Sequence, residues 1–149
     1  MTDGLDGSAR VTLEAGTMDT TSGSNDRESR ALRDPLMRFD LAEEIDRLTS
    51  EREWSEGDRN SIVLLKAPQQ RVLLTVMRAG SRVGDEEAAG PITIQVLGGR
   101  IVARRDVHSA ELGDGELATV APGGQWAVEA VEDSAILLTL GWKVDRTVD

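Results

Sequence analysis

The sequence contains no cysteine and no tyrosine, and it has a single phenylalanine and a single histidine. The lack of cysteine excludes disulfides, thiolate metal sites and thiol nucleophiles, and it fits a reducing cytoplasm. No run of 18 apolar residues occurs, so no segment is expected to span a membrane. The first residues, MTDGLDGSAR, lack the apolar core of a secretory signal. We therefore expect a cytoplasmic protein.

Basic side chains are also scarce. The 149 residues include 17 Lys and Arg against 27 Asp and Glu, which gives a formal net charge of −10. Nucleic-acid binders neutralise phosphates with basic side chains, and many stack bases on aromatic rings. Anionic membrane surfaces likewise attract basic segments. The composition therefore predicts neither a nucleic-acid partner nor a membrane partner, and the excess of negative charge favours solubility.

The two ends of the chain have the composition of tails. Residues 1–34 are rich in Gly, Ser, Thr and Asp, as in GTMDTTSGSNDRES. They offer too few large apolar side chains to offset the conformational entropy that folding removes. We expect a disordered N-terminal tail over 1–34 and a short C-terminal tail over 144–149.

The segment 35–58 has the pattern of a lead-in helix. Asp40 can cap the helix, with Glu43 three residues later as its capping partner. Apolar side chains then recur at the spacing of one helix face, at Leu41, Ile45 and Leu48. We expect a short amphipathic helix that packs against the rest of the protein and is ended by EWSEGD, with Gly57 as the stop.

In the segment 59–143 the hydrophobic period changes to two. Short runs rich in Val, Ile, Leu and Thr alternate with turn sequences, and the stretch 79–90 is expected to be a loop. The pair Gly98–Gly99 predicts a tight hairpin between PITIQVL and RIVARR. So many short strands indicate an all-β sandwich, jelly roll or barrel. The expected strands are SIVLLKA, RVLLTVMR, PITIQVL, RIVARRDV, SAEL, ELATVA, QWAVEAV and AILLTLGW.

The spacing of glycines in residues 71–142 resembles that of small single-domain cupins. The first motif of this family is G-x5-H-x-H-x3-E-x6-G, and here Gly80 and Gly99 frame it. The second is G-x5-P-x-G-x2-H-x3-N, which Gly115 opens and whose middle glycine Gly123 matches. The closing stretch VEAVEDSAILLTLGW also resembles the last hairpin of small cupins. The lead-in EREWSEGDRNSIVLLK is similar to that of an uncharacterised bacterial group of them.

The resemblance covers residues 38–142 and implies an all-β fold, a cupin-type double-stranded β-helix or jelly-roll barrel preceded by a short helix. The positions that hold metal ligands in the family are filled by Glu86, Ala88, Ile92 and Trp126. The spacing of the motifs is thus kept while the ligands are replaced. The resemblance therefore implies the cupin fold without the usual metal chemistry of the family.

Strand alternation gives an independent view of the barrel interior. Ile92 shares a strand face with Ile94 and Val96, and Trp126 shares one with Val128 and Ala130. Apolar side chains thus line the face on which metal ligands would lie. We expect a dry interior, either a filled core or a hydrophobic pocket, with no metal and no other cofactor.

Other metal-ligand candidates are few. Asp85, Glu86 and Glu87 are adjacent, so they cannot all point inward from an extended strand, and we expect them in a solvated loop. His108 lies outside both motifs, where we expect it to be a surface residue of a strand. A transition metal needs three or four converging ligands, and these residues do not supply them.

The tryptophans have two expected roles. Trp126 is expected to fill the core in place of an imidazole and its metal, with the wall of a ligand pocket as the alternative. Trp54 and Trp142 are expected to pack where the lead-in segment meets the barrel. The expected strand SIVLLKA is apolar on both faces, and such an edge strand would aggregate unless it were covered. A second copy of the chain would cover it, so we expect a homodimer.

No catalytic residue is assigned. Glu86 is a weak candidate for an acid or base, because its spacing directs it inward. No second acid–base group, Ser-His-Asp set, nucleophile elbow or P-loop accompanies it. Three functions stay open: a non-catalytic, metal-free binding or regulatory module, with or without a small apolar ligand in the barrel; a metal-independent isomerase, epimerase or lyase; and a purely structural or interaction protein.

Overall fold

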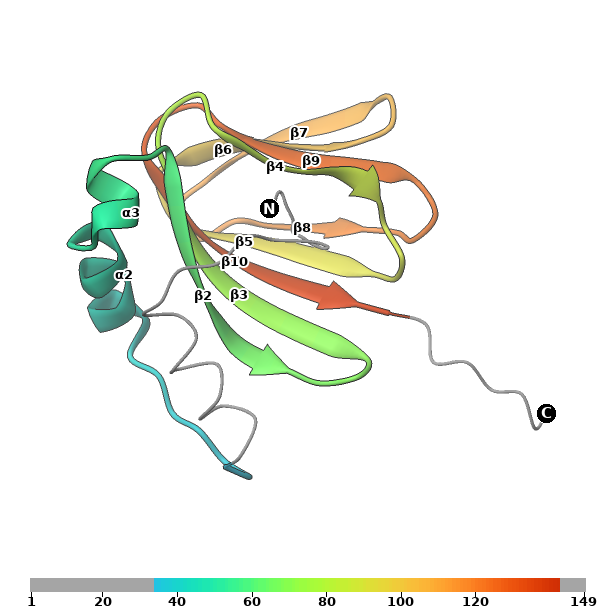
Figure 1. Cartoon of the computed structure of the whole chain (residues 1–149). Helices are drawn as coiled ribbons and strands as arrows, with labels where there is room; N and C mark the ends of the chain where they lie inside the picture. The colour runs from blue at the N-terminus through green and yellow to red at the C-terminus, as the bar shows by residue number, and fades with distance from the viewer. Residues whose placement is uncertain (1–33, 143–149) are drawn as a thin grey trace.

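The computed structural model describes residues 34–142, and apart from Asp34 the two predicted tails lie outside this range. In the described part, two helices precede nine strands, which form two antiparallel sheets with the orders β2-β3-β10-β5-β8 and β4-β9-β6-β7 (Figure 1). The expected all-β jelly-roll barrel is confirmed. The elements are α2 (Leu41–Thr49), α3 (Arg52–Ser55), β2 (Arg59–Lys66), β3 (Gln70–Met77), β4 (Arg82–Glu87), β5 (Ile92–Gly98), β6 (Arg100–Arg105), β7 (His108–Gly113), β8 (Leu117–Val120), β9 (Gln125–Ala130) and β10 (Ser134–Gly141).

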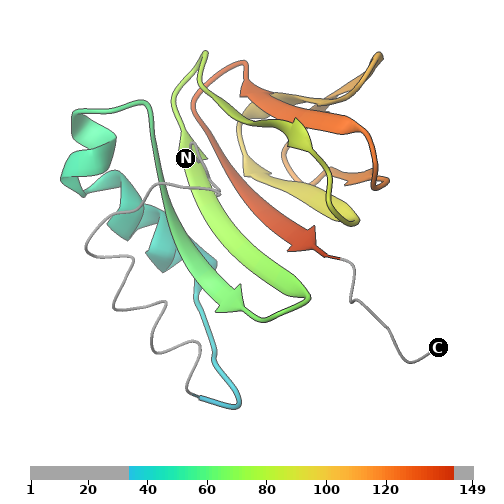
Figure 2. The same ribbon diagram turned by 45° about the vertical axis from the view of Figure 1, so that its right-hand side comes forward.

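Helix α2 begins as the sequence predicts. The backbone N–H of Glu43 donates to the Asp40 side chain at 3.2 Å, so Asp40 is the N-cap. Leu48 is fully buried, and Leu41 and Ile45 pack against the same cluster. The two helices lie on the outer side of the sheet, beside β2 and β3 (Figures 1 and 2). Among residues 34–142, no helix is long and apolar enough to cross a membrane.

The end of the helix differs from the prediction. Helix α2 stops at Thr49, with Ser50 as its C-cap, and α3 follows before Gly57 is reached. The Thr49 hydroxyl donates to the Ile45 carbonyl at 3.0 Å, and the Ser50 hydroxyl donates to the Arg47 carbonyl at 2.8 Å. Hydroxyl groups thus satisfy the last carbonyls of the helix. A glycine is therefore not needed at this end.

The buried side chains form two clusters, one on each face of the five-stranded sheet. The larger cluster lies between the two sheets, and the smaller one lies between the outer face and the helices. Strand β3 contributes to both, because side chains alternate along a strand. Leu73 and Met77 pack in the barrel, while Leu74 and Val76 pack beneath the helices. The middle of this sheet is therefore buried on both sides.

Strand β4 lies within the stretch 79–90, which the sequence predicts to be a loop. Its pairing with β9 shifts register between Gly84 and Glu86. Gly84 and Asp85 have φ angles of 95° and 61°, so a β-bulge interrupts the strand. Val83 is its one buried residue. Apolar and polar residues alternate over only a short stretch here, and several residues favour turns, so the sequence does not predict this strand.

The hairpin predicted at Gly98–Gly99 is wrong. Strands β5 and β6 on either side of this pair belong to different sheets, so the two glycines form a corner between the sheets. Gly99 has a φ of 100°, and its N–H donates to the Asp114 carboxylate at 2.8 Å. The tight hairpin comes later, at Asp106 and Val107 between β6 and β7. Asp106 supplies the left-handed φ of 54° that a glycine would usually provide.

Strand β2 is an edge of the five-stranded sheet. Ile62 and Leu64 are buried, and they belong to the cluster beneath the helices. Val63 is half-buried and Leu65 is 37% exposed. The chain's own helices therefore cover one face of this edge strand.

Candidate functional site

Three of the predicted site residues come together inside the barrel. Ala88 follows β4, Ile92 begins β5 and Trp126 lies in β9, and each is 2–3% exposed. All three belong to the cluster between the sheets. The side chains that alternation predicts to share this interior, Ile94, Val96, Val128 and Ala130, are buried in the same cluster. The expected apolar interior is confirmed at these positions.

The fourth predicted site residue, Glu86, lies differently from the prediction. It is opposite Trp126 in the pairing of β4 with β9, so it belongs to the same site. Its side chain is nevertheless exposed, whereas its spacing predicts a buried, inward carboxylate. The bulge at Gly84 and Asp85 lies directly before it and changes the pleat of the strand. Glu86 therefore lies at the rim of the barrel.

Structural comparison identifies the architecture. No family model and no curated protein matches the chain. A conserved protein of unknown function from Streptococcus pyogenes matches with a TM-score of 0.59 and 17% identity, over 75% of this chain and 92% of that one. A cupin superfamily protein from Desulfitobacterium hafniense matches with a TM-score of 0.54 and 19% identity, over 57% of this chain and 78% of that one. The chain has the cupin fold.

Cupin architecture alone does not assign an activity. A mutant of the salicylate 1,2-dioxygenase from Pseudoaminobacter salicylatoxidans is also similar, with a TM-score of 0.58 and 17% identity. The match covers 76% of the present chain but 41% of the dioxygenase. Similar folds thus occur both in an enzyme and in a protein of unknown function. The function of this chain has to be argued from its own side chains.

The residues at the cupin ligand positions do not fit a transition metal. Ala88 and Ile92 have no donor atoms in their side chains, and the indole of Trp126 offers only an N–H. Glu86 adds a single carboxylate, which is short of the three or four ligands required. Within residues 34–142, no three His, Cys, Asp or Glu side chains are grouped so that they could hold a metal ion. His108 is exposed at the start of β7, as predicted.

The acidic cluster next to the site is part of an ion-pair network. Asp85 receives two hydrogen bonds from Arg82, at 2.7 and 3.1 Å. Arg82 also lies 3.3 Å from Glu129, which in turn lies 3.6 Å from Arg104. The hydrogen bonds that Arg82 donates to Asp85 raise the pKa of Arg82, against a smaller opposing effect of burial. Asp85 thus holds the bulge in place from within the strand and is not in the loop that the sequence predicts.

Trp54 has the predicted packing role. The Arg78 guanidinium lies 4.1 Å from the centre of the Trp54 ring and donates to the Trp54 carbonyl at 3.1 Å. Arg78 also lies 3.7 Å from the Asp133 carboxylate. These contacts tie α3 to the ends of β3 and β10. The junction between the lead-in segment and the barrel is therefore fixed by a stacked cation as well as by apolar packing.

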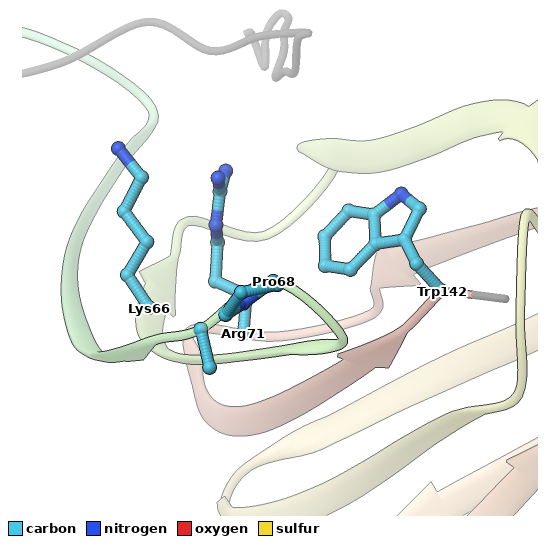
Figure 3. A pocket seen from close by; sticks show the side chains of 5 residues that line it. Lys66, Pro68, Arg71 and Trp142 are labelled. Carbon is cyan, nitrogen blue, oxygen red and sulfur yellow. The ribbon is translucent and has the colours of Figure 1, made fainter. Parts of the chain in front are cut away.

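Trp142 differs from the prediction, because it lines an open pocket. It follows β10 and is 37% exposed, with the Arg71 guanidinium 5.5 Å from its ring centre. Lys66, Ala67 and Pro68 complete a pocket of about 460 Å³ (Figure 3). The sequence did not predict this pocket. One signal was present, since residues 59–78 contain four basic and no acidic side chains in a strongly acidic chain.

Proposed function

We propose that this cupin is a non-catalytic, cytoplasmic binding or regulatory module that works without a metal ion. The observation that carries the proposal is the burial of Ala88, Ile92 and Trp126, at 2–3% exposure, in the cupin ligand positions. An interior filled with apolar side chains stabilises the barrel through burial and close packing. If the module also binds a small apolar ligand inside the barrel, the Trp126 indole has to move aside to make room for it.

The position of Glu86 supports the absence of catalysis. A catalytic carboxylate is usually tuned by burial among apolar groups in a cleft. Glu86 is exposed at the rim, and the interior residue opposite it is Trp126. The indole N–H is a donor only and does not ionise near neutral pH, so it cannot act as the second acid–base group. This arrangement favours a binding role over an isomerase, epimerase or lyase.

The metal-free state can be tested directly. Protein purified without chelator is expected to contain far less than one equivalent of any transition metal per chain, because the ligand positions offer a single exposed carboxylate. Elemental analysis of the desalted protein measures this. One equivalent of iron, manganese, nickel or zinc per chain would contradict the proposal.

We also propose that the module is a homodimer joined through β2. This strand of eight residues is an edge, and Leu65 on it is 37% exposed. Long apolar edge strands invite pairing, and a symmetric second copy satisfies the edge without open-ended aggregation. Light scattering at micromolar concentration is expected to give twice the chain mass of 16.1 kDa. A mass near 16.1 kDa would refute the dimer.

A further inference from the structure

Strand β7 forms one edge of the four-stranded sheet, at the opposite side from β4 (Figure 1). The Asp106 N–H donates to the Gln125 carbonyl at 2.8 Å, toward β9, so the backbone groups of the preceding residue, Arg105, face β7. On β7, alternation then directs the N–H and C=O groups of Ser109 and Glu111 away from β6. Within residues 34–142, no strand pairs with this outer edge.

Both faces of the outer half of β7 are also accessible. Residues 108–111 are all exposed. Ala110 lies on the barrel side, because its cross-strand partner Ala103 is buried in the cluster between the sheets. Val107, at the tip of the β6–β7 hairpin, is 92% exposed. An incoming strand can therefore reach this edge from the side of the hairpin tip.

Strand β7 lacks the features that usually protect a sheet edge. Natural edges are made unsuitable for pairing by bulges, by Lys or Pro, or by their short length. Strand β4 is bent by the bulge at Gly84 and Asp85, and β8 has four residues. Strand β7 has six residues, HSAELG, and pairs with β6 without a shift of register. It is thus a regular strand whose outer edge is suited to pairing.

We propose that β7 pairs with the β7 strand of a second copy of this chain, antiparallel and about a two-fold axis. In the register that we favour, Ser109 lies opposite the partner's Glu111, and each such pair exchanges both of its N–H···O bonds. Ala110 then lies on the axis, where the Cα atoms of facing residues are about 4.5 Å apart and small side chains fit. A register with Glu111 opposite the partner's Glu111 would oppose like charges.

The charges on the outer face of the sheet fit this register. Ser109 lies opposite Arg104, whose side chain is 43% exposed. In the joined sheet the partner's Glu111 lies two strands away from Arg104, at about 10 Å between backbones, with the small Ser109 between them. The guanidinium and the carboxylate can meet above this serine. The two-fold axis produces the same pair a second time, so the surface is complementary to itself.

Both charges keep their partners within the chain. Arg104 lies 3.6 Å from the Glu129 carboxylate, and Glu111 lies 3.2 Å from the Arg100 guanidinium. A guanidinium has five N–H donors and a carboxylate accepts several hydrogen bonds, so each can take a further partner. The pair across the axis therefore extends an existing network. It gives the interface its register, while the backbone bonds of β7 hold the two copies together.

Amide hydrogen exchange of the full-length protein, followed by NMR at micromolar and millimolar concentration, tests the pairing. The N–H groups of Ser109 and Glu111 are expected to exchange at least about threefold more slowly at the higher concentration, because pairing protects them. The Thr119 N–H on β8 is the internal control. Val96 bonds to Glu116 at 2.9 Å, so alternation directs the Thr119 N–H away from β5, and its exchange is expected to be independent of concentration.

Two charge variants test the register. Arg104→Glu and Glu111→Arg each place like charges across the axis, so each alone is expected to weaken the association at least about tenfold. An equal mixture of the two variants is expected to associate again, to within about threefold of the wild type, because opposite charges then meet on both sides of the axis. Sedimentation velocity measures both. Glu56→Arg is the matched control, since it makes the same charge change at a 68% exposed side chain on α3 and is expected to associate like the wild type.

The inference is overturned if the exchange of Ser109 and Glu111 does not depend on concentration, or if the mixed charge variants fail to associate. Ser109→Pro removes an N–H that the native sheet does not use, so it is expected to abolish the protection of Glu111. The homodimer proposed at β2 fails separately. If Ser109→Pro has the mass of a single chain at micromolar concentration, the β2 contact is refuted, while the mixed charge variants still decide the β7 contact.

Discussion

Replacing Trp126 with alanine is expected to lower the free energy of unfolding by roughly 3–5 kcal/mol. The indole is 3% exposed and packs with Ile92 and Ala88 in the cluster between the two sheets. Its removal would take a large apolar surface out of the core and leave a cavity that the paired strands around it cannot collapse to fill. Urea unfolding of the variant and the wild type, compared at equal m-values, measures the difference.

Glu86→Gln is the control at the same site. It lies opposite Trp126 but is exposed, so its effect on stability is expected to stay within about 1 kcal/mol. If Trp126→Ala instead costs less than about 1 kcal/mol, the indole does not fill the barrel. A cavity would then already exist in the native protein, and the barrel interior would be a working ligand pocket.

Gly99→Ala is expected to destabilise the protein by roughly 3–5 kcal/mol, because strain and overpacking act together there. Gly99 has a φ of 100°, which a residue with a Cβ atom rarely adopts. A Cβ at this position would also lie 2.7 Å from the Ser134 Cα. That contact is with backbone, so it cannot be relieved by a side-chain rotation. Thermal and urea unfolding of the variant measure the cost.

Gly98→Ala provides the matched comparison one residue earlier. No atom lies within 4 Å of a Cβ placed on Gly98. The cost is expected to be under about 1 kcal/mol, as for an unstrained position that gains a methyl group. Equal costs at the two glycines would mean that the corner between the sheets is flexible enough to absorb a side chain at either position.

The sequence predicted those parts of the fold in which one periodicity extends over a whole element. Alternation in PITIQVL and QWAVEAV gave the buried faces of β5 and β9 correctly, and the helical spacing of Leu41, Ile45 and Leu48 gave the packed face of α2. Each of these segments has most of its buried side chains on one face. Local pattern and tertiary environment therefore agree, and the prediction needs no knowledge of the partner.

The features that escaped prediction depend on residues far apart in the chain. Strand β4 buries only Val83 and is bent by the bulge at Gly84 and Asp85, so its partner β9 defines it more than its own sequence does. The Gly98–Gly99 pair has the residues of a hairpin turn. The chain nevertheless passes from one sheet to the other there, because β5 pairs with β10 and not with β6. The pocket at Trp142 joins a hairpin to a strand end some 70 residues away.

The burial of the central strands on both faces has a consequence for how the protein unfolds. Strand β3 contributes Leu73 to the barrel core and Leu74 to the cluster beneath the helices, and β10 likewise contributes Ile136 and Ala135. Detaching the helices would leave the outer face of these strands in water, while opening the barrel would remove the sheet on which the helices rest. The two clusters thus lose their support together. Helices and barrel form a single cooperative unit, and a partly unfolded state with either half intact gains little stability from the half that remains.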